Sequence, residues 1–274
     1  MKHPSIAFIG AGNMASSLIG GLIADRYPAN KIWASNPKQD ELSQLQECFE
    51  IHVTPDNREA ANACDILVLA VKPSLLKSVI LEISDILRER KPLIISIVTG
   101  IRSETIMKWA ECNTLSIVRC MPNTPALLRC GTTGLCPNAY VSEEEQTTAE
   151  SILRSVGVTV WFDDEQDLDV VTALSGSGPA YFFLVMEAMI ETATALGLDP
   201  EQAQLLTVNT AIGAARMALE SGKAVHVLRE QVTSPGGTTE QAIGVLESGG
   251  IRDLFARALI AAKNKASEMS QLLE

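Results

Sequence analysis

The feature that most constrains the fold of this chain is a glycine-rich segment near its start. Residues 5–9 form an apolar run, and Gly10-Ala11-Gly12-Asn13-Met14-Ala15 follow it directly. Gly10 permits a tight turn, Gly12 lets another group approach the backbone closely, and Ala15 is small enough for a helix to pack on a strand. The pattern predicts a strand, a turn and a helix that starts at residue 13.

Short apolar runs alternate with helical patterns through the first 160 or so residues. The runs are apolar almost throughout, as strands covered on both faces require. Strands are predicted at residues 5–9, 31–35, 66–71, 93–98, 115–121, 131–135 and 158–162, and helices at 13–25, 40–48, 75–88, 103–109 and 143–154. This order predicts an α/β fold, with a Rossmann domain built on a doubly wound, mostly parallel sheet.

An acidic cluster at residues 163–169 marks the predicted boundary to an all-helical domain. Carboxylates complement the positive end of a helix dipole, so we interpret the cluster as a solvated helix start and not as a metal site. Helices are predicted at 178–196, 199–221, 235–247 and 251–274. The first is apolar on nearly every face and must be covered on all sides. We therefore predict domains 1–162 and 163–274, the second forming an intertwined homodimer, with a monomeric bundle as the alternative.

Composition excludes several classes of protein. The net charge of −11 disfavours nucleic acid and anionic membranes as partners. No uninterrupted run of eighteen apolar residues predicts a membrane span, and no signal-peptide cleavage site is evident, so we expect a cytoplasmic protein. Six cysteines without a C-x-x-C pair, and only three histidines, predict reduced thiols and no metal site. Residues 163–274 carry a net charge of −9 against −2 for residues 1–162, which leaves the first domain freer to bind an anionic ligand.

The glycine-rich turn predicts a dinucleotide site. Free N–H groups at the start of a helix bind phosphate, and here strand, motif, helix and second strand follow in the required order. The second strand ends in Ser35-Asn36-Pro37-Lys38, without the acidic residue that usually holds the ribose hydroxyls of NAD. Ser35, Asn36 and Lys38 can serve a 2′-phosphate, which favours NADPH, with NADH as the alternative.

Later strand ends extend the predicted cofactor site, because ligands lie beyond the carboxyl ends of strands in such sheets. Lys72 follows one apolar run, and polar turns follow two others at residues 96–100 and 121–125. These turns line the nicotinamide or are ordinary turns. The predicted cofactor-binding residues from these strand ends and the glycine-rich turn are Ile9, Gly10, Ala11, Gly12, Asn13, Met14, Ser35, Asn36, Lys38, Ala70, Val71, Lys72, Pro73, Met121, Pro122 and Asn123.

Two further glycine-rich segments occur in the helical region. Residues 175–181, Ser-Gly-Ser-Gly-Pro-Ala-Tyr, predict a helix start capped by Ser177 or a pocket wall. Residues 233–240, Thr-Ser-Pro-Gly-Gly-Thr-Thr-Glu, predict a second helix start at Ser234-Pro235 with Gly236 and Gly237 in its first turn. Glycines cost about 1 kcal/mol each inside a helix, so a close approach by a ligand is their better explanation. We predict that Ser234, Gly236, Gly237, Thr238 and Thr239 bind a small carboxylate.

Taken together, these segments and their order resemble the pyrroline-5-carboxylate reductase family over essentially the whole chain. The resemblance implies NAD(P)H-dependent reduction of a five-membered cyclic imine to L-proline, the last step of proline biosynthesis. It also implies a helix-swapped homodimer that assembles into a decamer in some members. By position, Gly237, Thr238 and Thr239 hold the substrate carboxylate through backbone N–H groups, the Thr239 hydroxyl contacts the ring nitrogen, and Asn57 contacts the cofactor ribose.

The chain departs from the family pattern twice, and two other functions remain open. Asn36-Pro37-Lys38 stands where many members have an arginine, and Thr99 stands where alanine is frequent. A β-hydroxyacid dehydrogenase shares the two-domain plan but needs a lysine on its central helix, and residues 178–196 contain none. A non-catalytic NADP-binding sensor would bind the cofactor without reducing an imine.

Overall fold

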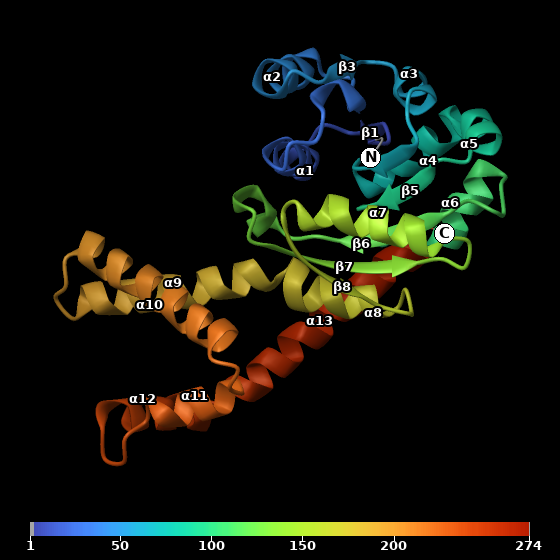
Figure 1. The fold of residues 1–274 in the computed structure, drawn as a ribbon. Coiled ribbons are helices and arrows are strands. Elements are labelled where there is room, and N and C mark those ends of the chain that lie inside the picture. The colour runs from blue at the N-terminus through green and yellow to red at the C-terminus, as the bar shows by residue number, and fades with distance from the viewer. Residues whose placement is uncertain (1–2, 274) are drawn as a thin grey trace. The chain divides into compact units, whose positions relative to one another are not determined.

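The computed structural model describes residues 3–273, and its contacts divide the chain into two compact units. One unit is Met1–Ser177 with Ala261–Glu274, and the other is Gly178–Ile260. The division falls after residue 177, beyond the predicted boundary at residue 162, and the end of the chain belongs to the first unit. Figure 1 shows the order of the elements along the chain.

The first unit is built on one eight-stranded sheet of order β3-β2-β1-β4-β5-β6-β7-β8. Neighbouring strands are parallel except for β6 and β7, which confirms the predicted doubly wound, mostly parallel sheet. The strands are β1 (Ile6–Ile9), β2 (Ile32–Ser35), β3 (His52–Thr54), β4 (Ile66–Leu69), β5 (Leu93–Ser96), β6 (Ile117–Met121), β7 (Gly131–Pro137) and β8 (Gly157–Trp161). The chain order reverses between β1 and β4, where ligands bind in such sheets.

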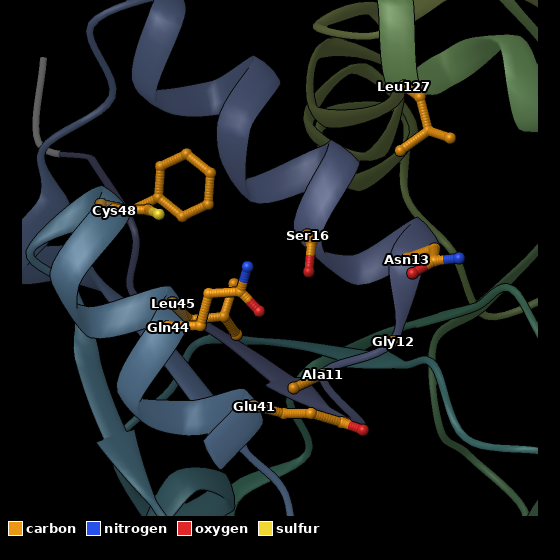
Figure 2. Close-up of a pocket in the computed structure, with 10 residues that line it drawn as sticks. Ala11, Gly12, Asn13, Ser16, Glu41, Gln44, Leu45, Cys48 and Leu127 are labelled. Carbon is orange, nitrogen blue, oxygen red and sulfur yellow. The ribbon is translucent and has the colours of Figure 1, made fainter.

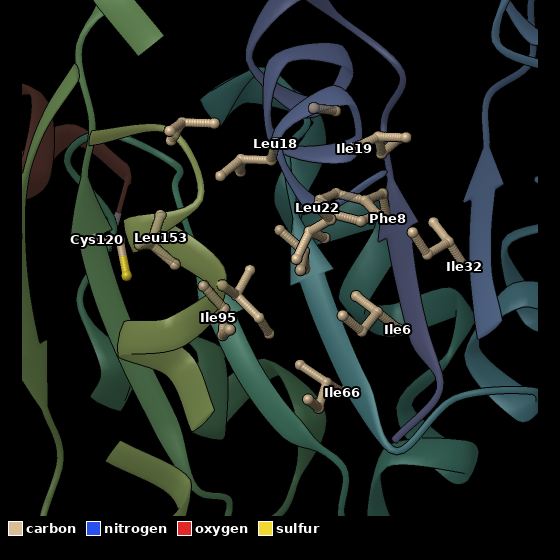
Figure 3. Packing of buried hydrophobic residues seen from close by; sticks show 14 of the residues in the cluster. Ile6, Phe8, Leu18, Ile19, Leu22, Ile32, Ile66, Ile95, Cys120 and Leu153 are labelled. Carbon is tan, nitrogen blue, oxygen red and sulfur yellow. The ribbon is translucent and has the colours of Figure 1, made fainter. Parts of the chain in front are cut away.

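Helices cover both faces of this sheet. Those of the first unit are α1 (Asn13–Ala24), η1 (Ala29–Lys31), α2 (Gln39–Phe49), α3 (Asn57–Asn62), α4 (Pro73–Glu82), α5 (Ser84–Arg90), α6 (Ser103–Ala110), η2 (Thr124–Leu128), α7 (Glu143–Arg154), α8 (Asp167–Val171) and η3 (Thr172–Gly176), together with the end of α13 (Ile251–Leu273). Successive residues of β1 point to opposite faces, so Phe8 enters one core cluster and Ile9 the other. Figure 3 shows the first cluster, where Leu18 and Leu22 of α1 face Phe8.

Several details differ from the predicted elements, among them the helix α11 (Val225–Gln231), which the sequence did not predict. The short strand β3 and helix α3 follow one another with little periodic signal in the sequence, and the prediction omitted both. The helix predicted at 75–88 is two helices, because Ile83 leaves the helical conformation at φ −109° and ψ 10°.

The acidic cluster does more than begin a helix. Glu165 pairs with the buried Arg119 at 2.8 Å between Oε2 and Nη1, and it also accepts from the Ser103 N–H. Asp169 is buried and accepts from the Ser267 hydroxyl of α13 at 2.7 Å. The prediction of a purely solvated helix start was therefore wrong, because two of these carboxylates tie the helix to the first unit.

Helix α9 (Gly178–Ala195) begins within the segment at residues 175–181, as the sequence predicted, but it follows another helical stretch and not a loop. The chain is helical from α8 onward through η3, a π-helical turn in which the Ser177 N–H donates to the Thr172 carbonyl at 2.8 Å. Pro179 has no N–H to donate to the Ser175 carbonyl, and the Asn123 side chain donates to that carbonyl instead at 3.0 Å. Ser177 has helical backbone angles and so caps nothing. The predicted capping role was wrong.

The second unit contains α9 (Gly178–Ala195), α10 (Pro200–Glu220), α11 (Val225–Gln231), α12 (Thr238–Ser248) and the start of α13. Large apolar side chains of α9 are open in the single chain: Phe182 is 68% exposed and Phe183 64%. A central helix of a monomeric bundle would be buried, so that alternative was wrong. The exposed apolar face requires another surface to cover it.

One continuous helical stretch, Asp167–Ala195, is long and apolar enough to cross a membrane by length and composition. The sequence expectation considered only uninterrupted apolar runs and missed a window that contains a few charges. A soluble protein's apolar helix passes the same test, so this finding is weak evidence for a membrane span.

Candidate cofactor and substrate sites

The glycine-rich turn lies at the point where the sheet reverses its order. Gly10 has φ +98°, and a Cβ at this position would lie 2.7 Å from the Ala70 carbonyl oxygen. The Gly10 N–H donates to the Ser35 carbonyl at 2.9 Å, so the turn is fastened to the neighbouring strand. Both the conformation and the close approach require glycine here, as the sequence predicted.

The space around Gly12 is open, whereas the space around Gly10 is filled by the Ala70 backbone. It is the residue before α1, and a Cβ on it would have no atom within 4 Å. No side chain caps the start of α1, so its first N–H groups are free for an anion. The turn and α1 form one wall of a cavity of about 470 Å³, and α2 forms another (Figure 2). These residues fit a dinucleotide. Gly10 permits the tight turn, and the open space at Gly12 lets a pyrophosphate approach the backbone closely.

The polar residues predicted at the end of β2 come together as expected, but they are already hydrogen-bonded. The buried Ser35 hydroxyl donates to Asn57 Oδ1 at 2.8 Å, and Asn57 Nδ2 donates to Glu82 at 2.9 Å. Asn36 Nδ2 and Lys38 Nζ both donate to Glu41, the latter at 2.6 Å. The end of β2 contains no acidic residue, as the sequence showed, but Glu41 of the following helix supplies an acidic partner.

Glu41 lies in the first turn of α2 and contributes to the cavity wall. The Lys38 ammonium, with Asn36 beside it, holds the pKa of the Glu41 carboxyl below its ordinary value. Gln44 and Cys48 follow Glu41 at helical spacing on the same wall. The sequence predicted this helix, and its periodicity alone could have identified the face that sequence reasoning missed.

The later strand ends are partly brought together. The Thr99 hydroxyl after β5 lies 3.7 Å from the sulfur of Met121 in β6, so these two turns adjoin. Lys72 is exposed directly before α4. Asn123 is 9% exposed. Its side chain donates to the Ser175 carbonyl and accepts from the Thr132 N–H at 2.8 Å. These contacts give Asn123 a structural function at this turn.

The glycines of the second unit form a turn before α12 and are not inside the helix. The Gly237 N–H donates to the Ser234 carbonyl at 3.0 Å, and Gly236 has φ +70°. A turn with proline second and a left-handed glycine third explains the Ser-Pro-Gly-Gly sequence. The predicted helix start at Pro235 was wrong by three residues, because α12 begins at Thr238. The cost of glycine within a helix therefore does not apply here.

Two of the amides expected to bind the carboxylate are engaged in this turn. Besides the Gly237 N–H, the Gly236 N–H donates to Glu240 Oε2 at 2.7 Å. No side chain caps α12, and the N–H groups of Thr238 and Thr239 have no hydrogen-bond partner within residues 3–273. Thr238 is exposed and Thr239 is half-buried. This helix start offers two free amides and two hydroxyls to an anionic group.

No group of three or more potential metal-ligating side chains occurs in the described part of the chain. The cysteines are free thiols there. Burial raises the pKa of the Cys64 thiol to about 12. Cys64 is buried in the core of the first unit, whereas the exposed Cys48 lines the cavity beside the glycine-rich turn.

Two family models match separate parts of the chain. Residues 5–100 match the family described as NADP oxidoreductase, coenzyme F420-dependent, and residues 165–269 match pyrroline-5-carboxylate reductase dimerisation. Fold and turn thus define an NADP-dependent oxidoreductase with a helical region that forms oligomers.

Relatives along the whole chain narrow the class further. The pyrroline-5-carboxylate reductase of Pseudomonas aeruginosa is 46% identical over 273 residues, which cover 100% of this chain and 99% of the relative. That of Escherichia coli is 35% identical over 267 residues, which cover 97% and 98%. The chain belongs to the pyrroline-5-carboxylate reductase family.

Solved structures give the same result. A pyrroline-5-carboxylate reductase from Coxiella burnetii superimposes with a TM-score of 0.93 at 50% identity, covering 98% of this chain and 99% of the other. The Plasmodium falciparum pyrroline carboxylate reductase, solved with NADP bound, gives 0.87 at 30% identity and the same coverage.

Proposed function

We propose that this chain reduces 1-pyrroline-5-carboxylate to L-proline with NADPH. The observation that carries the proposal is the turn at the reversal point of the sheet, where Gly10 is crowded and Gly12 is open beside a cavity of about 470 Å³. Membership of the reductase family supplies the substrate. The proposed reaction is the last step of proline biosynthesis. NADH is the alternative cofactor.

The chemistry requires positioning more than a strongly basic or acidic side chain. The bound cofactor supplies a hydride to the imine carbon. The imine nitrogen gains a proton, and a cyclic imine can arrive protonated, so the protein needs mainly to orient the ring and contact the nitrogen. We assign the nitrogen contact to the Thr239 hydroxyl, and the carboxylate contact to the segment from Ser234 to Thr239.

The carboxylate contact depends on the free amides of Thr238 and Thr239, which are the ones the turn leaves available. The partial positive charge at the start of α12 favours an anion there without an arginine. Gly236 and Gly237 shape the turn that presents these amides. In the cofactor site we assign contacts to the glycine-rich turn, Ser35, Asn36, Lys38, Asn57 and the strand ends at residues 70–73 and 121–123.

The exposed apolar faces of the second unit support the proposed oligomeric state. We propose an intertwined homodimer, since Phe182 and Phe183 need a partner surface. Assembly into a decamer rests on the family resemblance, and light scattering on the purified protein at several concentrations tests both. Residues 1–162 are assigned to the cofactor and residues 163–274 to substrate and dimerisation. We expect a cytoplasmic protein, testable by cell fractionation.

One experiment tests the function directly. NADPH and NADH oxidation is followed spectrophotometrically with pyrroline-5-carboxylate, its six-membered homologue and a 3-oxo acid. Oxidation with the five-membered imine and formation of proline support the proposal. Turnover of the 3-oxo acid alone indicates a β-hydroxyacid dehydrogenase, and cofactor binding without any turnover indicates a sensor. One methylene is worth only about 1–3 kcal/mol of discrimination, so some reduction of the six-membered imine is expected.

A further inference from the structure

Glu41 occupies the donors that the sequence assigns to a 2′-phosphate. Asn36 Nδ2 donates to Glu41 Oε2, and Lys38 Nζ donates to Glu41 Oε1 at 2.6 Å. Asn36 is 8% exposed, so its amide has few other partners available. One carboxylate therefore satisfies both donors at the end of β2.

The Glu41 side chain lies in the predicted cofactor site as well as at the protein surface. Glu41 lines the same cavity as Gly12 and Asn13, and its side chain extends beside Ala11 (Figure 2). The Glu41 side chain is 37% exposed and the Lys38 side chain 72%, so solvent and ligand can reach the pair. A dinucleotide whose pyrophosphate lies at Gly12 would place its adenosine ribose toward the end of β2.

The charges at this strand end favour the unphosphorylated ribose. Lys38 and Glu41 neutralise each other, so the Asn36–Lys38–Glu41 group offers no net positive charge. A phosphate monoester carries a charge of about −1.5 to −2 at neutral pH, and it would meet the Glu41 carboxylate as a like charge. Ribose hydroxyls, in contrast, can donate to a carboxylate, as they do in NAD-binding sites.

We propose that Glu41 is the residue that sets the balance between NADPH and NADH in this chain. It accepts from the ribose hydroxyls of NADH, and it competes with the 2′-phosphate of NADPH for Lys38 and Asn36. NADPH binding then requires that the carboxylate releases both donors. The inference rests on the proposed dinucleotide-dependent function, and its test is made by cofactor binding, without the imine.

The experiment measures the dissociation constants of NADP⁺ and NAD⁺ by calorimetry for the wild-type protein and three variants. Glu41→Gln keeps the shape of the side chain and removes its charge. Glu47→Gln removes a charge from the same helix α2, at an exposed position that lines no described cavity and forms no ion pair within residues 3–273. Adenosine 2′,5′-bisphosphate and AMP serve as further probes, because they differ only in the 2′-phosphate.

For Glu41→Gln we expect the ratio of the NAD⁺ to the NADP⁺ dissociation constant to rise about fivefold or more, the effect of one charge at about 4 Å in a water-like medium. The bisphosphate should bind more tightly than before and AMP less tightly. Glu47→Gln should leave the ratio unchanged. The third variant, Lys38→Met, should weaken the binding of NADP⁺ more than that of NAD⁺.

An unchanged ratio in Glu41→Gln, or an equal change in Glu47→Gln, overturns the inference. A thermal melt of each variant separates a local effect from misfolding, and the two AMP probes report the local effect even if the nicotinamide half is disturbed. If the wild-type protein binds both dinucleotides and the ratio shifts as expected, but no imine is reduced, the proposed function fails and the inference on Glu41 stands.

Discussion

Replacement of Gly10 by alanine tests whether the first glycine is required by the fold itself. A Cβ at this position would lie 2.7 Å from the Ala70 carbonyl oxygen and 2.8 Å from its carbonyl carbon. The contacting atoms are backbone at the end of β4, so they cannot rotate away as a flexible side chain could. The backbone at Gly10 also has φ +98°, a value that residues other than glycine rarely adopt.

These two effects set the size of the expected loss. A residue in a sparsely populated backbone region costs about 1–3 kcal/mol, and overpacking in a closed site costs a further 1–3 kcal/mol or so. We expect Gly10→Ala to lower the free energy of unfolding by about 2–6 kcal/mol and Tm by at least about 4 °C. Gly12→Ala is the matched control, because its φ is −74° and its Cβ would meet no atom within 4 Å.

The assay combines thermal melts at one fixed protein concentration with NADP⁺ titration by calorimetry. A fixed concentration is needed because the stability of an oligomer depends on it. Gly12→Ala should melt within about 0.5 kcal/mol of wild type but bind NADP⁺ more weakly, since the methyl group occupies the approach of the pyrophosphate. Equal destabilisation by both variants, or unchanged NADP⁺ affinity in Gly12→Ala, would refute this reasoning.

Three further perturbations address other parts of the chain. Thr239→Val removes the proposed contact to the ring nitrogen, and we expect turnover in steady-state kinetics to fall about tenfold or more with unchanged NADP⁺ affinity. Glu165→Gln removes the charge paired with Arg119, which is 5% exposed, and chemical denaturation should show a loss of about 3–5 kcal/mol. Burial raises the pKa of Cys64 from 9.0 to about 12, so the folded state keeps a proton that the unfolded chain releases. Stability from this thiol is present below about pH 9 and is lost as the pH rises toward 12, and a Cys64→Ala variant should show a flatter pH dependence of unfolding.

Each of these has a clear contrary outcome. Thr238→Val is the control for Thr239, and an equal loss of turnover in both would remove the special function of Thr239. A change of less than about 1 kcal/mol for Glu165→Gln would mean that Arg119 finds another partner or solvent. Alkylation followed by mass spectrometry should modify the exposed Cys130 well before Cys64 in the folded protein, and equal rates would contradict the burial of Cys64.

Local signals in the sequence predicted the first unit well. The apolar runs that became β1, β4 and β5 are buried on both faces, so their composition shows directly in the sequence. The turn at Gly10 was predictable because its conformation excludes other residues. The short β3 and α3 were not, since three and six residues carry too little periodicity to separate them from a loop.

The sequence by itself determined the doubly wound sheet, the glycine-rich turn and the unusually apolar helix α9, because each depends on residue types at fixed local spacing. Only the tertiary structure decided what distant side chains meet. It brought the Asn123 side chain to the Ser175 carbonyl and Glu165 to the buried Arg119. The glycine-rich turn has the conformation that the sequence predicted. At the end of β2 the residue types alone did not show that Asn36 and Lys38 both donate to Glu41, because side-chain orientations are decided only in the folded chain.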